Sequence, residues 1–227
     1  MTFALVLLCT VAACFALRNP LKACPMAFYA LSVAVDAAFV AGTAFGMPRE
    51  VWSMFFILIQ KCLLPLALFV VVMYIGVLPR ESRPYAWLKP VRAELSIVAW
   101  ILSLGHMAVY LASYLPRILA GGPFNVNVTV SFAVAAVLLV LLLLLGVTSF
   151  NFVKKRMRTE SWKKLQRLAY PFFALTYVHL LLMLAPSALR GGIAAEASVA
   201  VYSIVFIGYF VLRPVRAALD RRARRAT

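Results

Sequence analysis

The strongest constraint in this sequence is a repeated pattern of long apolar stretches separated by short polar connections. The stretches cover residues 2–17, 25–47, 51–78, 93–115, 127–150, 168–189 and 194–212. Crossing a bilayer takes about 20 predominantly apolar residues in an α-helix, and most of these stretches are that long. We therefore expect an all-α fold, a polytopic transmembrane helical bundle of six to seven spans. The first stretch is the shortest, and without it the count is six.

The composition agrees with a membrane location and excludes several classes of protein. The chain has 227 residues, of which 65% are hydrophobic and 13% charged, whereas soluble domains are nearer half apolar and a quarter charged. With most of its length in apolar stretches, the chain has no room for a soluble nucleotide-binding or flavin-binding domain. Walker, G-x-G-x-x-G, G-x-S-x-G and H-E-x-x-H motifs are absent, and the four cysteines form no metal-binding pattern. An enzyme with its own substrate chemistry is therefore disfavoured.

The net charge of +16 would suggest a nucleic-acid partner if the basic residues were not so unevenly placed. Alternate connections and the C-terminal tail hold 19 of the 23 basic residues, and Arg49, Arg117 and Arg190 lie in the opposite connections. This asymmetry is typical of the positive-inside rule and predicts an external N-terminus and a cytoplasmic C-terminus. We expect a multi-pass integral protein of a bacterial inner (plasma) membrane that contacts the lipid bilayer and binds no nucleic acid.

The same pattern divides the chain into three parts. Residues 1–24 are expected to form a first span and a short cytoplasmic loop, residues 25–212 a transmembrane helical core, and residues 213–227 a basic cytoplasmic tail.

The two histidines of the chain, His106 and His179, both lie in the middle of apolar stretches. His106 is 14 residues beyond Arg92 and His179 is 12 beyond Arg167, which places them about 21 Å and about 18 Å along their helices from the cytoplasmic ends. The two stretches are predicted to run in the same direction with one helix between them. Both imidazoles are therefore expected at one depth, toward the outer face.

Two imidazoles at one depth on different helices are suited to holding a heme iron from both sides, since bundle cores build such sites from facing helices. A zinc site is less favoured, because no third ligand is predicted at that level. The alternative is that each histidine bonds a neighbouring helix and has only a structural role.

Two segments of the sequence resemble motifs of one known family. The segment from Arg92 through Leu95 to His106 and Tyr110 resembles the R-x-x-L…H-x-x-x-Y span of ferric-reductase-like transmembrane proteins. The segment from Trp162 through Arg167 and Tyr170 to His179 is similar to their W-x-x-L-x-R-L-x-Y…H span. That superfamily includes the heme-binding membrane subunit of the periplasmic methionine sulfoxide reductase system, and the resemblance covers about residues 50–212.

The resemblance implies a six-helix core, b-type heme and electron transfer across the membrane, with His106 and His179 at the family's ligand positions. Family members often have a second histidine about 13 residues before a ligand, whereas this chain has Gln166 there. We therefore expect one heme per chain. A quinone, or a flavin carried by a partner protein, would then supply electrons from the cytoplasmic side.

Asp36 and Lys61 are ionisable residues within neighbouring spans, where charge is costly and therefore a sign of function. They are placed to meet as an ion pair. Such a pair either fixes helix packing or forms a quinone or proton site beside the heme.

Four further residues near the histidines are candidate cofactor contacts, namely Gly105, Tyr110, Tyr177 and Arg117. Gly105 could let a flat macrocycle approach the helix backbone, or could serve as a small residue at a helix contact. The two tyrosines could bond heme propionates or a quinone, or simply pack. Arg117 could bind a propionate, or could extend its side chain to the membrane surface.

The sequence thus predicts an electron-transfer subunit of an oxidoreductase system. Electrons from a quinol or flavoprotein donor would pass through a bis-histidine heme to an acceptor or partner protein outside the membrane. The alternative function is a heme-free membrane transporter or scaffold with structural histidines.

Overall fold

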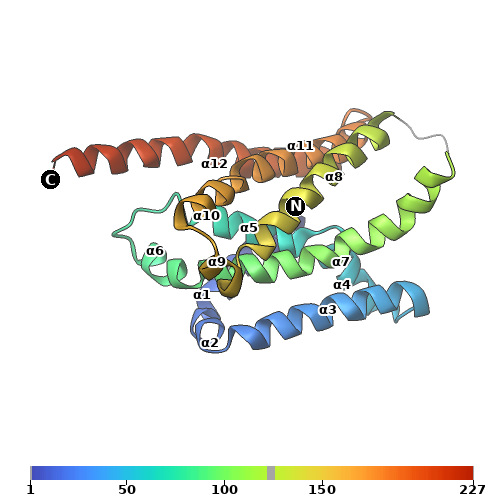
Figure 1. Ribbon diagram of the computed structural model, residues 1–227. Coiled ribbons are helices and arrows are strands. Elements are labelled where there is room, and N and C mark those ends of the chain that lie inside the picture. The colour runs from blue at the N-terminus through green and yellow to red at the C-terminus, as the bar shows by residue number, and fades with distance from the viewer. Residues whose placement is uncertain (1, 122–125, 227) are drawn as a thin grey trace.

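The computed structural model describes residues 2–121 and 126–226, and over these residues every regular element is a helix (Figure 1). Met1, residues 122–125 and Thr227 lie outside the described residues. The predicted segments 1–24 and 213–227 and the connection between residues 115 and 127 are therefore described only in part. The all-α fold expected from the sequence is confirmed over the described residues.

Within the described residues, six helical segments are long and apolar enough to cross a membrane, as expected. The six are Pro25–Phe45, Arg49–Tyr74, Arg83–Leu119, Val126–Val147, Thr159–Ala188 and Ile193–Ala223. The first apolar stretch forms α1 (Thr2–Ala16), which is about 22 Å long and shorter than the roughly 30 Å of a hydrocarbon core. It leads into the short α2 (Arg18–Ala23) and packs against α5, within the bundle.

The centre of the bundle is α5 (Leu63–Tyr74), which has nine buried residues among its twelve. It packs against α1 and against α7 (Arg92–Leu119), and its aromatic and aliphatic side chains also meet α12 (Ile193–Ala226). The Tyr74 hydroxyl donates a hydrogen bond of 2.7 Å to the Val205 carbonyl and so ties α5 to α12. Because α5 is apolar on all sides, it takes the position with helices around it.

The second membrane-spanning segment, which covers most of the apolar stretch of residues 51–78, is broken near its middle. It consists of α4 (Arg49–Phe55), the π-helical turn η1 (Phe56–Gln60) and α5. The Lys61 amide bonds the Phe56 carbonyl, five residues back, and Cys62 has a left-handed φ of 56°. Pro65 explains the break, because its ring would clash with the Lys61 carbonyl in a continuous helix.

One layer of helices lies on each side of α5. On one side α3 (Pro25–Phe45) packs along α7, and on the other α11 (Ala169–Ala188) packs against α8 (Val126–Val147) and α12. Figure 1 shows α7 and α11 running in the same direction, with α8 returning between them in the chain. This is the arrangement that the sequence predicted for the two histidine-bearing spans.

Short helices and ion pairs lie at the end of the bundle where basic residues gather. Between α5 and α7 lie α6 (Arg83–Leu88) and η2 (Lys89–Val91), and between α8 and α11 lie α9 (Asn151–Arg156) and α10 (Thr159–Gln166). The segment predicted as a separate tail from residue 213 continues α12 and extends beyond its neighbours (Figure 1). Asp220 in this extension pairs with Arg80 at 3.2 Å and with Arg216 at 2.9 Å. Which side of the membrane this end faces stays a prediction of the charge pattern.

Candidate functional site

His106 is half-buried in α7 and is held by a backbone group of a different helix. Its Nδ1 lies 2.6 Å from the Gln60 carbonyl oxygen, at the end of η1. Since a carbonyl only accepts hydrogen bonds, the neutral ring must have its proton on Nδ1 and donate it. The Nε2 atom then keeps its lone pair, which is the state of a histidine that ligates a metal through Nε2.

The Gln60 carbonyl was not anticipated from the sequence. The break between η1 and α5 brings it to His106, because a π-turn redirects carbonyl groups that a regular α-helix would keep for its own amides. The available signal was Pro65, whose missing N–H and bulky ring disturb the helix one turn earlier.

Gly105 makes room for a carboxylate of α3. The Gly105 amide donates a hydrogen bond of 3.0 Å to Asp36 Oδ2, and a Cβ at this glycine would lie 2.5 Å from Asp36 Oδ1. That Oδ1 is buried and has no hydrogen-bond partner. Of the two roles predicted for Gly105, the structure shows the contact between helices, with Asp36 filling its open side.

The expected ion pair between Asp36 and Lys61 is not formed. The ion pairs among the described residues join other side chains, and the exposed Lys61 ammonium lies 4.9 Å from the Phe56 ring centroid. The helix break turns Lys61 outward, since it precedes the left-handed Cys62. The quinone or proton role predicted for this pair would therefore rest on Asp36 alone.

Two other candidate residues lie further along α7. The Tyr110 ring is one helical turn from His106, with its centroid 4.8 Å from the imidazole centroid. Arg117 is exposed in the last turn of α7, 11 residues or about 16 Å beyond His106. The structure thus brings Tyr110 to the histidine and leaves Arg117 near the end of the span.

His179 is half-buried in α11, and its environment differs from that of His106. Its Nδ1 atom is buried without a hydrogen-bond partner, and the Ser131 backbone carbonyl of α8 lies beside the ring without a hydrogen bond of good geometry to that atom. His179 Nδ1 is one of several buried polar side-chain atoms without a hydrogen-bond partner among the described residues. The two imidazoles are close enough for their charges to interact.

Tyr177 faces away from His179 and toward α12. Its hydroxyl lies 2.8 Å from Ser203 Oγ, and its ring stacks on Phe206 with centroids 5.2 Å apart. Residues two apart on an α-helix point in nearly opposite directions, at about 100° per residue. His179 is therefore directed toward the α8 side of α11, and the predicted cofactor contact of Tyr177 is replaced by a contact between helices.

The geometry of the two histidines fits a heme better than a metal ion held by side chains alone. Among the described residues, no three His, Cys, Asp or Glu side chains lie together as a metal site would require. A heme supplies its own four nitrogens and needs only two protein ligands. The oriented ring of His106 fits that requirement, because its Nδ1 donates to Gln60 and its Nε2 is left free to ligate. His179 would be the second ligand.

The Trp162 and Gln166 positions of the second motif have structural contacts in α10. Trp162 Nε1 donates a hydrogen bond of 2.9 Å to the Thr148 carbonyl, and Gln166 Nε2 donates one of 3.2 Å to Thr148 Oγ1. Both bonds attach α10 to the end of α8. The residue that stands where a second heme ligand was sought is therefore engaged with Thr148.

Comparison with known protein families decides the classification. Residues 56–177, more than half of the chain, match the family described as "Ferric reductase like transmembrane component". The matched range includes His106 and ends two residues before His179. This chain belongs to that family. The resemblance found in the two sequence motifs is thereby confirmed, and membership of the ferric reductase-like family indicates a membrane electron-transfer subunit.

One relative in this comparison is an uncharacterized protein of Treponema pallidum (strain Nichols). It is 45% identical over 132 residues, which are 58% of this chain and 36% of the relative. The aligned region is thus little more than a third of the relative's length. No solved structure matches this chain.

Proposed function

We propose that this chain is a membrane cytochrome b subunit, in which His106 and His179 hold one heme b between α7 and α11. Its electrons would come from a quinol or a flavoprotein donor and leave to an acceptor or partner protein outside the membrane. The observation that carries the proposal is the pair of mid-span imidazoles on parallel helices, one oriented by Gln60 and the other with an orphaned buried nitrogen.

A heme iron with two imidazole ligands has no open position for oxygen or substrate, so it exchanges single electrons. The chain's own contribution is to fix the ligands. The Gln60 carbonyl sets the tautomer and ring orientation of His106, and an outer hydrogen bond of this kind also raises the basicity of the ligating nitrogen. Asp36 of α3 accepts a hydrogen bond from the amide of Gly105, the residue before His106, and so holds α7 against α3.

The surrounding helices exclude water from the His106 side of the site. The residues of α7 before His106 are largely buried, and α5 packs against them with its own buried aliphatic side chains. A dry, apolar surround lowers the local dielectric and helps to set the redox potential of a bound cofactor.

The alternative function is a heme-free transporter or scaffold with two structural histidines. The bond of His106 to Gln60 fits that role, because a structural histidine within a membrane needs a hydrogen-bond partner. The unpartnered Nδ1 of His179 does not fit it. The unequal environments of the two histidines therefore favour the cytochrome.

The test is the heme content of the purified chain and of four variants expressed in heme-replete cells. We expect a b-type difference spectrum and one heme per chain by pyridine hemochrome assay. His106→Ala and His179→Ala should each retain less than about a tenth of the heme, since loss of even an outer-shell partner costs roughly 10- to 100-fold in affinity.

The matched controls are Met107→Ala and Val178→Ala, which change a neighbouring side chain on the same helix and should keep the heme. Elution volume on size exclusion shows whether each variant is folded. A stable, colourless wild-type protein would favour the transporter or scaffold.

A further inference from the structure

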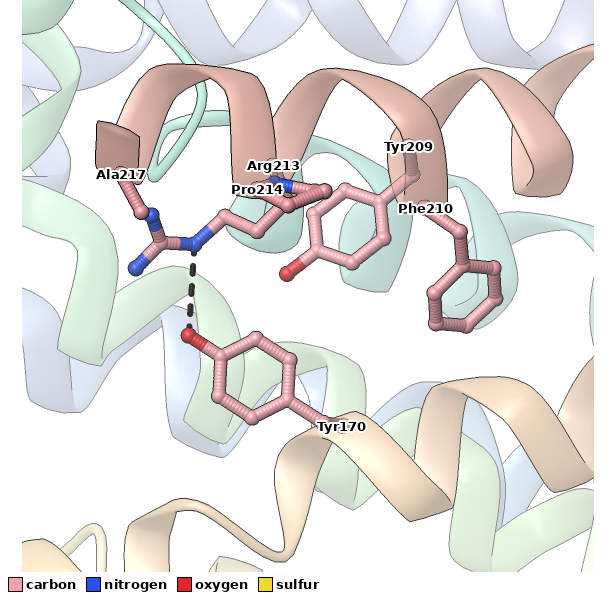
Figure 2. Close-up of a pocket in the computed structure, with 6 residues that line it drawn as sticks. All are labelled: Tyr170, Tyr209, Phe210, Arg213, Pro214 and Ala217. Carbon is pink, nitrogen blue, oxygen red and sulfur yellow. Dashed lines mark hydrogen bonds between the residues drawn. The ribbon is translucent and has the colours of Figure 1, made fainter. Parts of the chain in front are cut away.

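A second cluster of polar side chains lies near the first residue of α11, away from His179. A cavity of about 310 Å³ opens there between α11 and α12, and we call it the arginine cavity. Its lining residues are Tyr170, Tyr209, Phe210, Arg213, Pro214 and Ala217. Figure 2 shows the Tyr170 hydroxyl facing the Arg213 guanidinium, with the Tyr209 ring beside the arginine side chain.

The arginine cavity is separate from the histidine site. Tyr170 lies nine residues before His179 on the same helix, a rise of about 13 Å. Tyr170 and Arg92 belong to the two motifs of the sequence, yet neither contacts His106 or His179. The electron-transfer proposal therefore leaves their side chains without a role.

Arg213 is half-buried and lacks a carboxylate partner among the described residues. Its Nε donates a hydrogen bond of 3.2 Å to the Tyr170 hydroxyl oxygen. Two acidic side chains at this end of the bundle are engaged with other arginines: Asp220 pairs with Arg80 and Arg216, and Glu81 lies 3.7 Å from Arg216. The positive charge of Arg213 is thus left uncompensated beside a cavity.

A second guanidinium lies close by and repels the first. Arg92, at the start of α7, is near enough to Arg213 for their charges to interact, and both lie near Tyr170 and Tyr209. Arg92 Nε donates a hydrogen bond of 3.1 Å to the Val72 carbonyl, and the described ion pairs give it no carboxylate either. Two neighbouring cations without a counter-charge are unfavourable unless an anion is bound.

The donors of this cluster fit the oxygen atoms of a phosphate group. The planar guanidinium presents paired N–H groups that match phosphate geometry. The Tyr170 hydroxyl accepts from Arg213 and so keeps its own proton to donate. The Tyr209 and Phe210 rings supply an apolar wall for the carbon atoms that carry the phosphate.

We propose that the arginine cavity binds a phosphate group at the membrane surface, with Arg213 and Tyr170 as its donors and Arg92 as the second positive charge. The basic end of the bundle is where anionic lipids would gather. The phosphate belongs either to an anionic phospholipid headgroup or to a free phosphate in solution, and the two sources share this recognition chemistry.

The experiment measures lipid binding to the full chain in detergent by native mass spectrometry, with phosphatidylglycerol and phosphatidylcholine as probes. The wild type should bind phosphatidylglycerol about tenfold or more tightly than phosphatidylcholine, because the two arginines repel the choline cation that phosphatidylcholine carries beside its phosphate. Arg213→Gln should lose this preference, and Arg213→Lys should keep part of it. Tyr170→Phe, which removes one donor and keeps the ring, should weaken the preference by a few-fold.

The matched control is Arg190→Gln, because Arg190 is exposed and its Nε bonds the Pro186 carbonyl at the opposite end of α11. This variant should keep the wild-type preference. Inorganic phosphate that displaces the lipid at millimolar concentration would identify a soluble phosphate as the ligand, whereas no displacement would identify the headgroup. Equal binding of the two lipids by a wild type that also binds no inorganic phosphate, or an unchanged preference in Arg213→Gln, would overturn the proposal.

Discussion

The two histidines of this protein lie in halves of the bundle that are built differently. His106 belongs to α7, which has seven buried residues and packs against α3 and α5, and a carbonyl of another helix fixes its ring. His179 belongs to α11, in which Phe173 is the one buried residue, and its Nδ1 has no hydrogen-bond partner.

The difference indicates how a ligand held between the two helices would be bound. His106 is preorganised, because its hydrogen bond and packing limit the rotation of the ring. The orientation of His179 is set by fewer contacts, so a bound heme would itself complete the site on that side. Preorganising one ligand lowers the cost of binding, and a second ligand with freedom to adjust tolerates small errors in helix position.

The largest difference between the halves should appear in heme-free protein, where the two histidines act only through their own contacts. His106→Ala should destabilise the fold by about 2–4 kcal/mol, because it leaves the Gln60 carbonyl without its partner and opens a cavity. His179→Ala should cost less, because it also removes an unsatisfied nitrogen. Thermal unfolding in detergent measures both, and equal losses would show that the halves are equivalent.

A second test is directed at the contact between α3 and α7. Gly105→Ala should destabilise the protein by about 1–3 kcal/mol, because the added methyl group collides with the Asp36 carboxylate. The double variant Asp36→Ala/Gly105→Ala should recover part of the loss, since the smaller side chain frees the space. Additive losses in the double variant would contradict the contact, and thermal unfolding of all three variants provides the cycle.

A smaller effect is expected in the other half, at Tyr177. Tyr177→Phe removes the hydrogen bond to Ser203 and keeps the ring stacked on Phe206, so it should cost about 1 kcal/mol. Because this side chain faces α12, the heme spectrum should be unchanged. A shifted spectrum in this variant would mean that the hydroxyl contacts the cofactor after all.

The smallest effect is expected at Lys61. Its ammonium is exposed and has no ion pair with Asp36, so Lys61→Gln should change stability by less than about 0.5 kcal/mol. Asp36→Asn is the comparison, because it weakens a charge-assisted bond to the Gly105 amide and should cost more. Thermal unfolding measures the loss of stability in both variants. Equal losses would indicate that Asp36 and Lys61 form an ion pair.

The helices and their order were predictable from the sequence, and the contacts between helices were less so. Long apolar stretches identify spans because every backbone polar group must be satisfied within the membrane, which leaves helices as the structure for this chain. The positions of His106 and His179 near the middle of their helices followed from counting residues. The parallel direction of α7 and α11 followed from the single span between them.

The contacts that result from the helix break at Cys62 could not be predicted without the three-dimensional structure. Pro65 signals a distortion, but the direction in which Lys61 and the Gln60 carbonyl then point depends on the neighbouring helices. The same holds for Asp36, whose partner was sought in the next span and found in the Gly105 amide of α7. A side chain two residues away from a histidine can face the opposite way, as Tyr177 does relative to His179.

The central claim, two imidazoles on one iron, is tested most directly by the electron paramagnetic resonance spectrum of the oxidised, purified chain. The account predicts a low-spin ferric signal with bis-imidazole character in the wild type, replaced by a high-spin signal in whatever heme His179→Ala retains. A high-spin wild-type spectrum, or a low-spin spectrum that survives in both His106→Ala and His179→Ala, would contradict it.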